Sequence, residues 1–146
     1  MQASLRLARC VRENKVDLIE NEEYGYCSLI KATNHVLEKM KIENVTKAKV
    51  TSTKRIEKNL VESVAMREAL INAIVHNDFS QEIPPVFEIF SDRIEFTSYG
   101  GLIQGQSEED FFGCSSMPRN RELMRVFKDV GLVEQRFWNE PYPKCL

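Results

Sequence analysis

The sequence predicts a single α/β domain in which helices cover a small β-sheet. Two segments, 28–40 and 61–77, have the residue pattern of helices. Two β-rich segments, 86–92 and 93–99, meet at the polar residue Ser91, as the strands of an antiparallel hairpin do. The chain has 146 residues, of which 42% are hydrophobic and 29% are charged, and this is the size and composition of one globular domain.

Capping residues mark where the predicted helices begin and end. Ser28 opens the first of them, and His35 is expected on the rim of its apolar stripe, as a structural residue rather than a ligand. The stripe is formed by Leu29, Ala32, Val36, Leu37 and Met40. Near the other end of the chain, Asn120 is the expected cap of a helix over 121–130, which Gly131 closes.

Three further segments have a less regular pattern. Residues 4–14 have helical spacing, with Leu5 and Ala8 in one register, so we expect a helix there. The stretch from about Ala48 to Glu57 is rich in β-branched residues and predicts one strand. Residues 99–119 are rich in glycine and predict a long loop, in which the sequence SEED, beginning at Ser107, caps a short helical turn.

The charge balance limits the classes of partner. With 20 basic and 22 acidic residues the net charge is −2, so the chain as a whole lacks the cationic excess that binds nucleic acid. The most basic stretch, Lys47 to Arg55, predicts an exposed strand with a cationic face, and such edges are commonly lysine-rich without any ligand. DNA contact is therefore expected only weakly, through this strand or through a domain outside the chain.

The cysteines and the apolar runs indicate a cytoplasmic protein. Four cysteines, Cys10, Cys27, Cys114 and Cys145, lie far apart and form no CxxC pair, so neither a zinc site nor a disulfide framework is expected. No apolar run approaches the roughly 20 residues that cross a bilayer, and the amino terminus lacks the apolar core of a signal peptide. No membrane association is expected.

Glu68, Asn72 and His76 form the most informative polar pattern. They follow one another at four-residue intervals, so a helix places them on one face, about 6 Å apart along its axis. Their neighbours on that face are Val64, Ala65, Ala69, Ile71 and Val75. Inside an apolar stripe these polar groups need partners, because leaving them unpaired costs about 1 to 3 kcal/mol each. Two interpretations stay open: an internal hydrogen-bond network, or a groove in which a ligand lies.

Three segments together resemble a known ATPase-like family. REALINAIVHNDFS at 67–80 resembles the N-box helix of the Bergerat (GHKL) ATP-binding fold. With DRIEFTSYGGL at 92–102 and SSMPRNRELMRVFKDVGLVEQ at 115–135, it resembles more closely the carboxy-terminal ATPase-like domain of bacterial RecG-related proteins and transcriptional regulators, often joined to a Schlafen-type AlbA domain. The resemblance implies a two-layer α+β sandwich, in which helices cover a mixed or antiparallel sheet.

The resemblance also implies roles for the residues of the polar face. The glutamate matching Glu68 is the general base for water in family members that hydrolyse ATP. The asparagine matching Asn72 binds Mg²⁺ through its amide oxygen, in keeping with the preference of Mg²⁺ for oxygen ligands. His76 matches a polar position at the end of that helix and is a candidate phosphate contact.

The segment after the hairpin matches the adenine-binding part of the fold. Ser98, Gly100 and Gly101 fall at the DxGxG box, whose aspartate binds the adenine amino group, and the following loop corresponds to the ATP lid. For the two glycines a tight turn is an equally good explanation. Arg119 is a candidate phosphate or dimer contact, whereas capping of a helix is the favoured explanation for Asn120.

Two departures from the family pattern weaken the expectation of catalysis. Ser98 stands where an aspartate or asparagine is expected, and a hydroxyl is a weaker partner for adenine. After Gln135, where the family continues with a glycine-containing GTG segment of the lid, the chain has RFWNEPYPKCL. We therefore expect one domain over 1–146, with an amino-terminal part (1–60), an ATPase-like part (61–135) and a divergent tail (136–146), as in a truncated copy.

Three hypotheses for function follow. The first is a regulatory domain that binds ATP with Mg²⁺ and hydrolyses it weakly or not at all, with a homodimer as a possible assembly. The second is a non-catalytic interaction module of the same fold, in which Trp138 and the tail cover the sheet or bind a partner. The third is a DNA-binding accessory domain. A helicase motor is not expected, because the sequence has no GxxxxGK[ST] phosphate loop.

Overall fold

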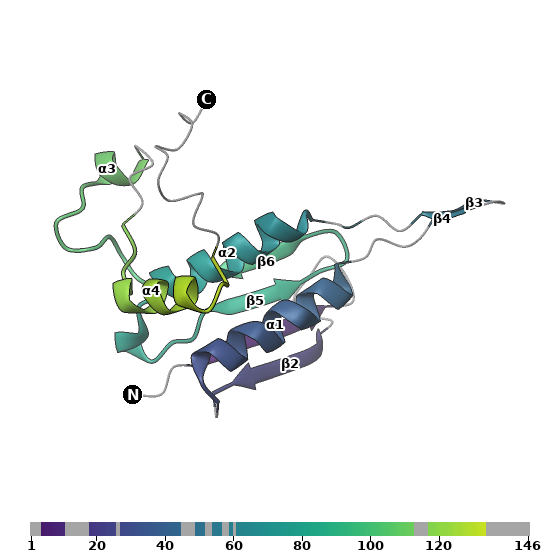
Figure 1. Ribbon diagram of the computed structural model, residues 1–146, viewed down its shortest axis with the longest axis horizontal. Coiled ribbons are helices and arrows are strands. Elements are labelled where there is room, and N and C mark those ends of the chain that lie inside the picture. The colour runs from purple at the N-terminus through teal and green to yellow at the C-terminus, as the bar shows by residue number, and fades with distance from the viewer. Residues whose placement is uncertain are drawn as a thin grey trace.

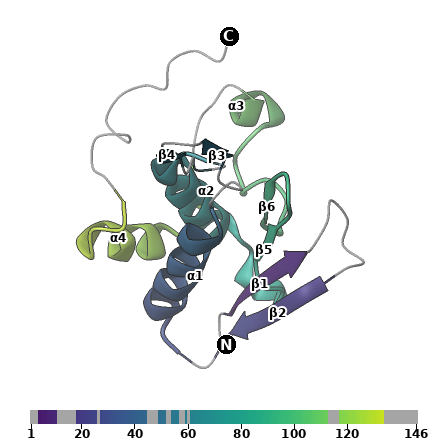
Figure 2. The same ribbon diagram turned by 90° about the vertical axis from the view of Figure 1, so that its right-hand side faces the viewer.

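A computed structural model of the protein shows a sheet covered on one face by helices (Figures 1 and 2). It describes residues 4–10, 18–25, 27–44, 49–51, 54–56, 59, 61–112 and 117–133. The elements in chain order are β1 (Leu5–Cys10), β2 (Leu18–Tyr24), α1 (Leu29–Glu43), β3 (Lys49–Thr51), β4 (Lys54–Ile56), α2 (Ser63–His76), the 3₁₀ turn η1 (Phe79–Gln81), β5 (Val86–Ile89), β6 (Ile94–Thr97), α3 (Glu108–Phe112) and α4 (Arg121–Asp129). The predicted α+β two-layer sandwich is confirmed.

The main sheet is mixed and has the strand order β2-β1-β5-β6. β1 pairs antiparallel with β2 and parallel with β5, and β5 pairs antiparallel with β6. The parallel pair requires a long crossover between β1 and β5, and α1 and α2 lie in this stretch of the chain. The predicted hairpin is confirmed as β5 and β6. Because β6 is an edge strand, the residues that follow it lie at the margin of the sheet.

The helix predicted over 4–14 is wrong, because its first part is strand β1. Leu5 and Leu7 are buried in the core while Arg6 between them is exposed, which is the period of two of a strand. Two partner strands hydrogen-bond to β1, one on each side. These pairings join segments far apart in the sequence, so the local spacing of Leu5 and Ala8 did not reveal them.

The single strand predicted from Ala48 to Glu57 is also wrong. Two short antiparallel strands, β3 and β4, occupy this stretch and pair Lys49 with Ile56 and Thr51 with Lys54. They form a separate two-stranded sheet, which lies away from the main sheet in Figure 1. The chain reverses within a segment rich in β-branched residues, and propensity alone does not locate such a turn.

Helix α1 begins at the predicted cap and has the predicted buried face, but it ends at Glu43, three residues after the predicted end. The Ser28 hydroxyl accepts a hydrogen bond from the Lys31 N–H at 3.3 Å and caps the first turn. His35 is exposed, with its ring 6.1 Å from that of Tyr24, at the edge of the apolar stripe. At the other end, the buried Asn44 side chain bonds both the N–H and the C=O of Val61, at 2.9 and 2.7 Å, and so ties α1 to the start of α2.

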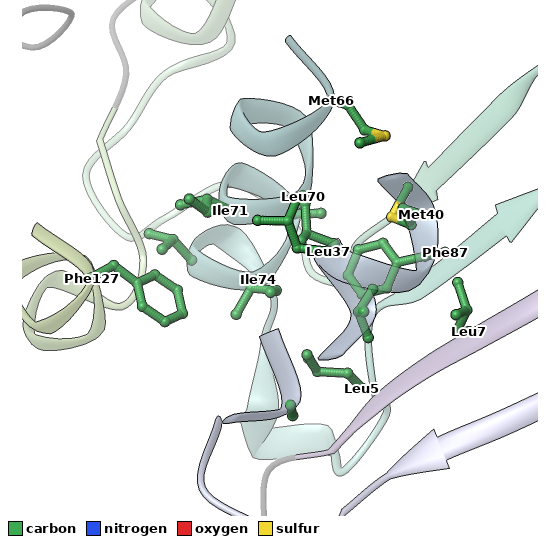
Figure 3. Close-up of a cluster of buried hydrophobic side chains, with 14 of the residues drawn as sticks. Leu5, Leu7, Leu37, Met40, Met66, Leu70, Ile71, Ile74, Phe87 and Phe127 are labelled. Carbon is green, nitrogen blue, oxygen red and sulfur yellow. The ribbon is translucent and has the colours of Figure 1, made fainter. Parts of the chain in front are cut away.

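The core lies between the helices and the sheet (Figure 3). Met66, Leu70 and Ile74 form the inner face of α2, and all three are fully buried. Phe87 of β5 contacts Phe96 of β6 edge to face, with ring centroids 5.9 Å apart. The remaining core side chains include Leu5, Leu7, Val36, Leu37, Met40, Ile71, Val75, Ile89, Met124 and Phe127. This packing sets the orientation of α2 relative to β5 and β6.

The segment after β6 contains two short helices. Ser107 and Asp110 cap α3 reciprocally: the Asp110 N–H donates to the Ser107 hydroxyl at 3.0 Å, and the Ser107 N–H donates to the Asp110 carboxylate at 3.2 Å. The predicted capped turn is thus confirmed. Gly131 follows α4 with φ of 73°, and its N–H bonds the Lys128 carbonyl at 3.0 Å, which confirms the predicted end of that helix.

Candidate functional site

The outer face of α2 carries Glu68, Asn72 and His76, as predicted, and all three are half-buried. The expectation that apolar neighbours enclose them is wrong. Val64 is 36% exposed and Ala65 is also exposed, whereas Ile71 and Val75 are buried. The polar face therefore borders solvent on its alanine side and lies outside the core.

The side chains of Glu68 and Asn72 have no hydrogen-bond or ion-pair partner within the part of the chain that the structure describes. An internal hydrogen-bond network, the first of the two interpretations, therefore has no support there. Both side chains can reach a ligand without breaking a described contact. The structure does not test their assignment as base and magnesium ligand, which stays a prediction.

His76 ends α2 and is connected to the segment before α4. Its carbonyl accepts a hydrogen bond from Nε of Arg119 at 3.2 Å. Partial burial of the imidazole, together with the positive charge of Arg119, holds its pKa below the ordinary value of 6.5. The ring is therefore neutral at physiological pH, and it would need an anionic partner to hold a proton there.

Ser98 to Gly101, which we call the glycine loop, leaves the end of β6. The main chain of Tyr99 is held on both sides: its N–H donates to Oδ1 of Asn77 at 2.9 Å, and its carbonyl accepts from the Asp78 N–H at 2.8 Å. Ser98, Gly100 and Gly101 are exposed. The loop that matches the adenine-binding box is therefore open to solvent and anchored to the end of α2.

Arg119 binds the glycine loop itself. Its Nη2 donates to the Gly101 carbonyl at 2.5 Å and its Nε donates to the His76 carbonyl, while Nη1 lies 3.8 Å from the Asp78 carboxylate. Hydrogen bonds from Ser80 lower the pKa of Asp78, so this carboxylate is ionised beside the guanidinium. The sequence predicts a phosphate or dimer contact at Arg119, and that role stays a prediction.

Asn120 occupies the N-cap position of α4, as predicted, but its side chain makes no capping hydrogen bond there. Its Nδ2 donates to the carbonyls of Val75 and Asn77, both at 2.8 Å, and its N–H donates to the Val75 carbonyl at 3.0 Å. These carbonyls belong to the last turn of α2, where no intrahelical donors remain. The amide thus closes the carboxyl end of one helix instead of the amino end of the next.

Asn77 is the residue that sequence reasoning missed. It is fully buried, and its amide donates to the Ile83 carbonyl at 3.0 Å while its oxygen holds Tyr99. A signal was present: Met66, Leu70, Ala73 and Asn77 share the buried face of α2, so the asparagine continues an apolar series. A polar residue in such a series must be hydrogen-bonded, which marks it as a structural anchor.

A separate cavity of about 560 Å³ lies at the amino end of α4. Its lining residues are Leu29, Phe79, Arg119, Asn120, Arg121, Glu122 and Leu123. The walls are mainly apolar, and neither Glu68 nor Asn72 contributes to them. This cavity is therefore distinct from the polar face of α2, although Arg119 contacts both the cavity and the glycine loop.

Comparison with protein families gives a match over 84–137 to the family described as "Putative ATP-dependent DNA helicase recG C-terminal". The resemblance to the RecG-related ATPase-like domain is confirmed. The matched stretch contains the glycine loop and Arg119 and begins after Glu68, Asn72 and His76. The glycine loop therefore lies in the part of the chain that is similar to this family.

Among solved structures, the DIP2311 protein from Corynebacterium diphtheriae matches with a TM-score of 0.72 and 18% sequence identity, over 91% of this chain. At that identity the match shows the fold alone. The chain spans 27% of the length of that protein. No curated protein sequence matches the chain.

No helix in the described residues is both long and apolar enough to span a membrane. The predicted tail, including Trp138, lies outside the described residues, as do Cys114 and Cys145. Of the other two cysteines, Cys10 is buried and Cys27 is exposed.

Replacing Gly100 with alanine should weaken the fold at the glycine loop. Gly100 has φ of +130°, and an added Cβ would lie 3.0 Å from Cβ of Asp78 and 3.1 Å from Nη2 of Arg119. We expect Gly100→Ala to lower the free energy of unfolding by about 2 kcal/mol, measured by urea denaturation. Gly101→Ala is the matched control, because a Cβ there meets no atom within 4 Å, and it should be neutral. Equal effects of the two changes would contradict this account.

The lowered pKa of His76 predicts a loss of stability in mild acid. The unfolded chain takes up a proton near pH 6.5, whereas the folded protein resists it, so the free energy of unfolding is fully retained above that pH and falls as pH decreases toward the lower, folded pKa. His76→Gln should remove this part of the decline between pH 7.5 and 5.5. The change is small because the ring is half exposed. An identical decline in the variant would contradict the prediction.

Proposed function

We propose that this RecG-related ATPase-like domain binds ATP with Mg²⁺, as a regulatory domain of the transcriptional-regulator kind, and hydrolyses it slowly or not at all. The observation that carries the proposal is the position of the exposed glycine loop, which is hydrogen-bonded to the end of the helix that bears Glu68, Asn72 and His76. A nucleotide needs such an arrangement, with an open main-chain segment for the base and a polar helix face for the phosphates.

The residue chemistry of the helix face suits phosphate and Mg²⁺. Asn72 offers an amide oxygen to the cation, and Glu68 one turn away is placed to orient a water molecule. Among the described residues no cluster of three or more His, Cys, Asp or Glu side chains could hold a metal ion. Mg²⁺ bound with nucleotide does not require one, since phosphate oxygens and water complete its coordination.

We propose slow turnover because the contact between the protein and the adenine base is weak. Ser98 presents a hydroxyl where a carboxylate would accept the hydrogen bond of the adenine amino group, and charged acceptors form hydrogen bonds about twice as strong. A nucleotide held loosely at its base is positioned less well for attack by water, and small misplacements lower reaction rates strongly. Binding without efficient hydrolysis suits a regulatory role.

A thermal unfolding series with nucleotide tests the proposed function. ATP with Mg²⁺ at about 100 times its Kd should stabilise the protein by about 2.7 kcal/mol, seen as a rise in Tm. Asn72→Ala should reduce the part of this rise that depends on Mg²⁺. Asn34→Ala, at an exposed position of α1, is the matched control and should respond like the wild type. No rise in Tm at millimolar ATP would count against nucleotide binding.

An interaction module of the same fold is the second candidate. It is favoured by exposed hydrophobic side chains in and next to the glycine loop, since Tyr99 is 36% and Leu102 is 42% exposed. Such side chains suit a protein partner or a second copy of the chain as well as a nucleotide base. If mass spectrometry detects bound nucleotide in the purified protein, an interaction module that has lost nucleotide binding is excluded.

A further inference from the structure

We propose that Asn77 and Arg119 are positioning residues, which hold the glycine loop in the conformation that receives the base of the nucleotide. This inference rests on the proposed function and assigns Arg119 a role at the loop in place of a phosphate contact. The two side chains come from different segments of the chain. Asn77 directly follows α2, and Arg119 lies just before α4. Both bind the main chain of the loop.

Asn77 holds the first half of the loop from a buried, hydrogen-bonded position. Its side chain is fully buried and bonded at both polar atoms, to the Ile83 carbonyl and to the Tyr99 N–H. The next residue, Asp78, bonds the Tyr99 carbonyl through its N–H. With both main-chain groups of Tyr99 occupied, Ser98 and Gly100 on either side of it have a defined placement.

Arg119 holds the second half of the loop through a two-pronged contact. One guanidinium donates through Nε to the His76 carbonyl and through Nη2 to the Gly101 carbonyl, and so bridges the end of α2 and the loop. A planar guanidinium can make both bonds at once in a fixed geometry, whereas a lysine ammonium is a single flexible point charge. The role requires the shape of arginine as well as its charge.

Close packing transmits the position of these side chains to the loop. A Cβ at Gly100 would lie 3.0 Å from Asp78 and 3.1 Å from Arg119, so the loop main chain already lies against both groups.

Ligand affinities distinguish a positioning residue from a phosphate contact. If Arg119 holds the loop, Arg119→Lys should lower the affinities for adenosine and for ATP by a similar factor. That factor is about tenfold, for the loss of a charged hydrogen bond. If Arg119 binds phosphate, the same variant should retain most of the affinity for ATP, and its affinity for adenosine should be unchanged. Arg125→Lys is the matched control, because Arg125 is exposed on α4 and its ion pair is with Glu122 on the same helix. Isothermal titration calorimetry of the wild type and both variants measures the six affinities.

Hydrogen exchange of the nucleotide-free protein tests the hold on the loop independently of binding. In Arg119→Lys the amides of 99–106 should exchange faster, with those of α2 unchanged, whereas Arg125→Lys should match the wild type. Asn77→Ala, which removes the oxygen that accepts from the Tyr99 N–H, should have the same local effect. Unchanged exchange at the loop in Arg119→Lys, with normal binding, would overturn this inference alone. A wild-type protein that binds neither adenosine nor ATP would overturn the proposed function as well.

Discussion

The hydrogen bonds of the buried Asn77 side chain determine how the candidate site is assembled. α2 ends one residue earlier, and the chain there must be joined both to the loop after β6 and to the start of α4. Asn77 bonds Tyr99 and Ile83 through its side chain, and its carbonyl accepts from Asn120. A buried amide with every group satisfied is stable, but one lost partner costs about 1 to 3 kcal/mol. The segments at Ile83, Tyr99 and Asn120 are therefore all joined to this one residue.

This connection joins the helix that carries the polar face to the glycine loop. Glu68 and Asn72 are half-buried on the side of α2 that faces away from the core residues Met66, Leu70 and Ile74, and the glycine loop is hydrogen-bonded to the end of the same helix. Core packing of Met66, Leu70 and Ile74 fixes the rotation of α2, so the outward direction of the polar residues follows from the apolar ones. The site is thus a consequence of how helix α2 is packed and where it ends.

Features coded locally could be predicted from the sequence, and features formed by long-range contacts could not. The Ser28 cap, the β5–β6 hairpin and the end of α4 at Gly131 each depend on a few neighbouring residues. By contrast, β1 takes its form from pairing with β2 and β5, and its apolar spacing also fits a helix. Asn120 shows the same limit, because its amide bonds carbonyls 43 and 45 residues away.

The most direct test of the central claim is to map where Mg²⁺–ATP perturbs the amide NMR spectrum of the ¹⁵N-labelled protein. The account predicts that the largest shifts fall on the outer face of α2, at Asn72 and His76, and on Gly100 and Gly101 of the glycine loop. Shifts confined to the apolar cavity beside Phe79 and Leu123, or no shifts at millimolar nucleotide, would contradict it.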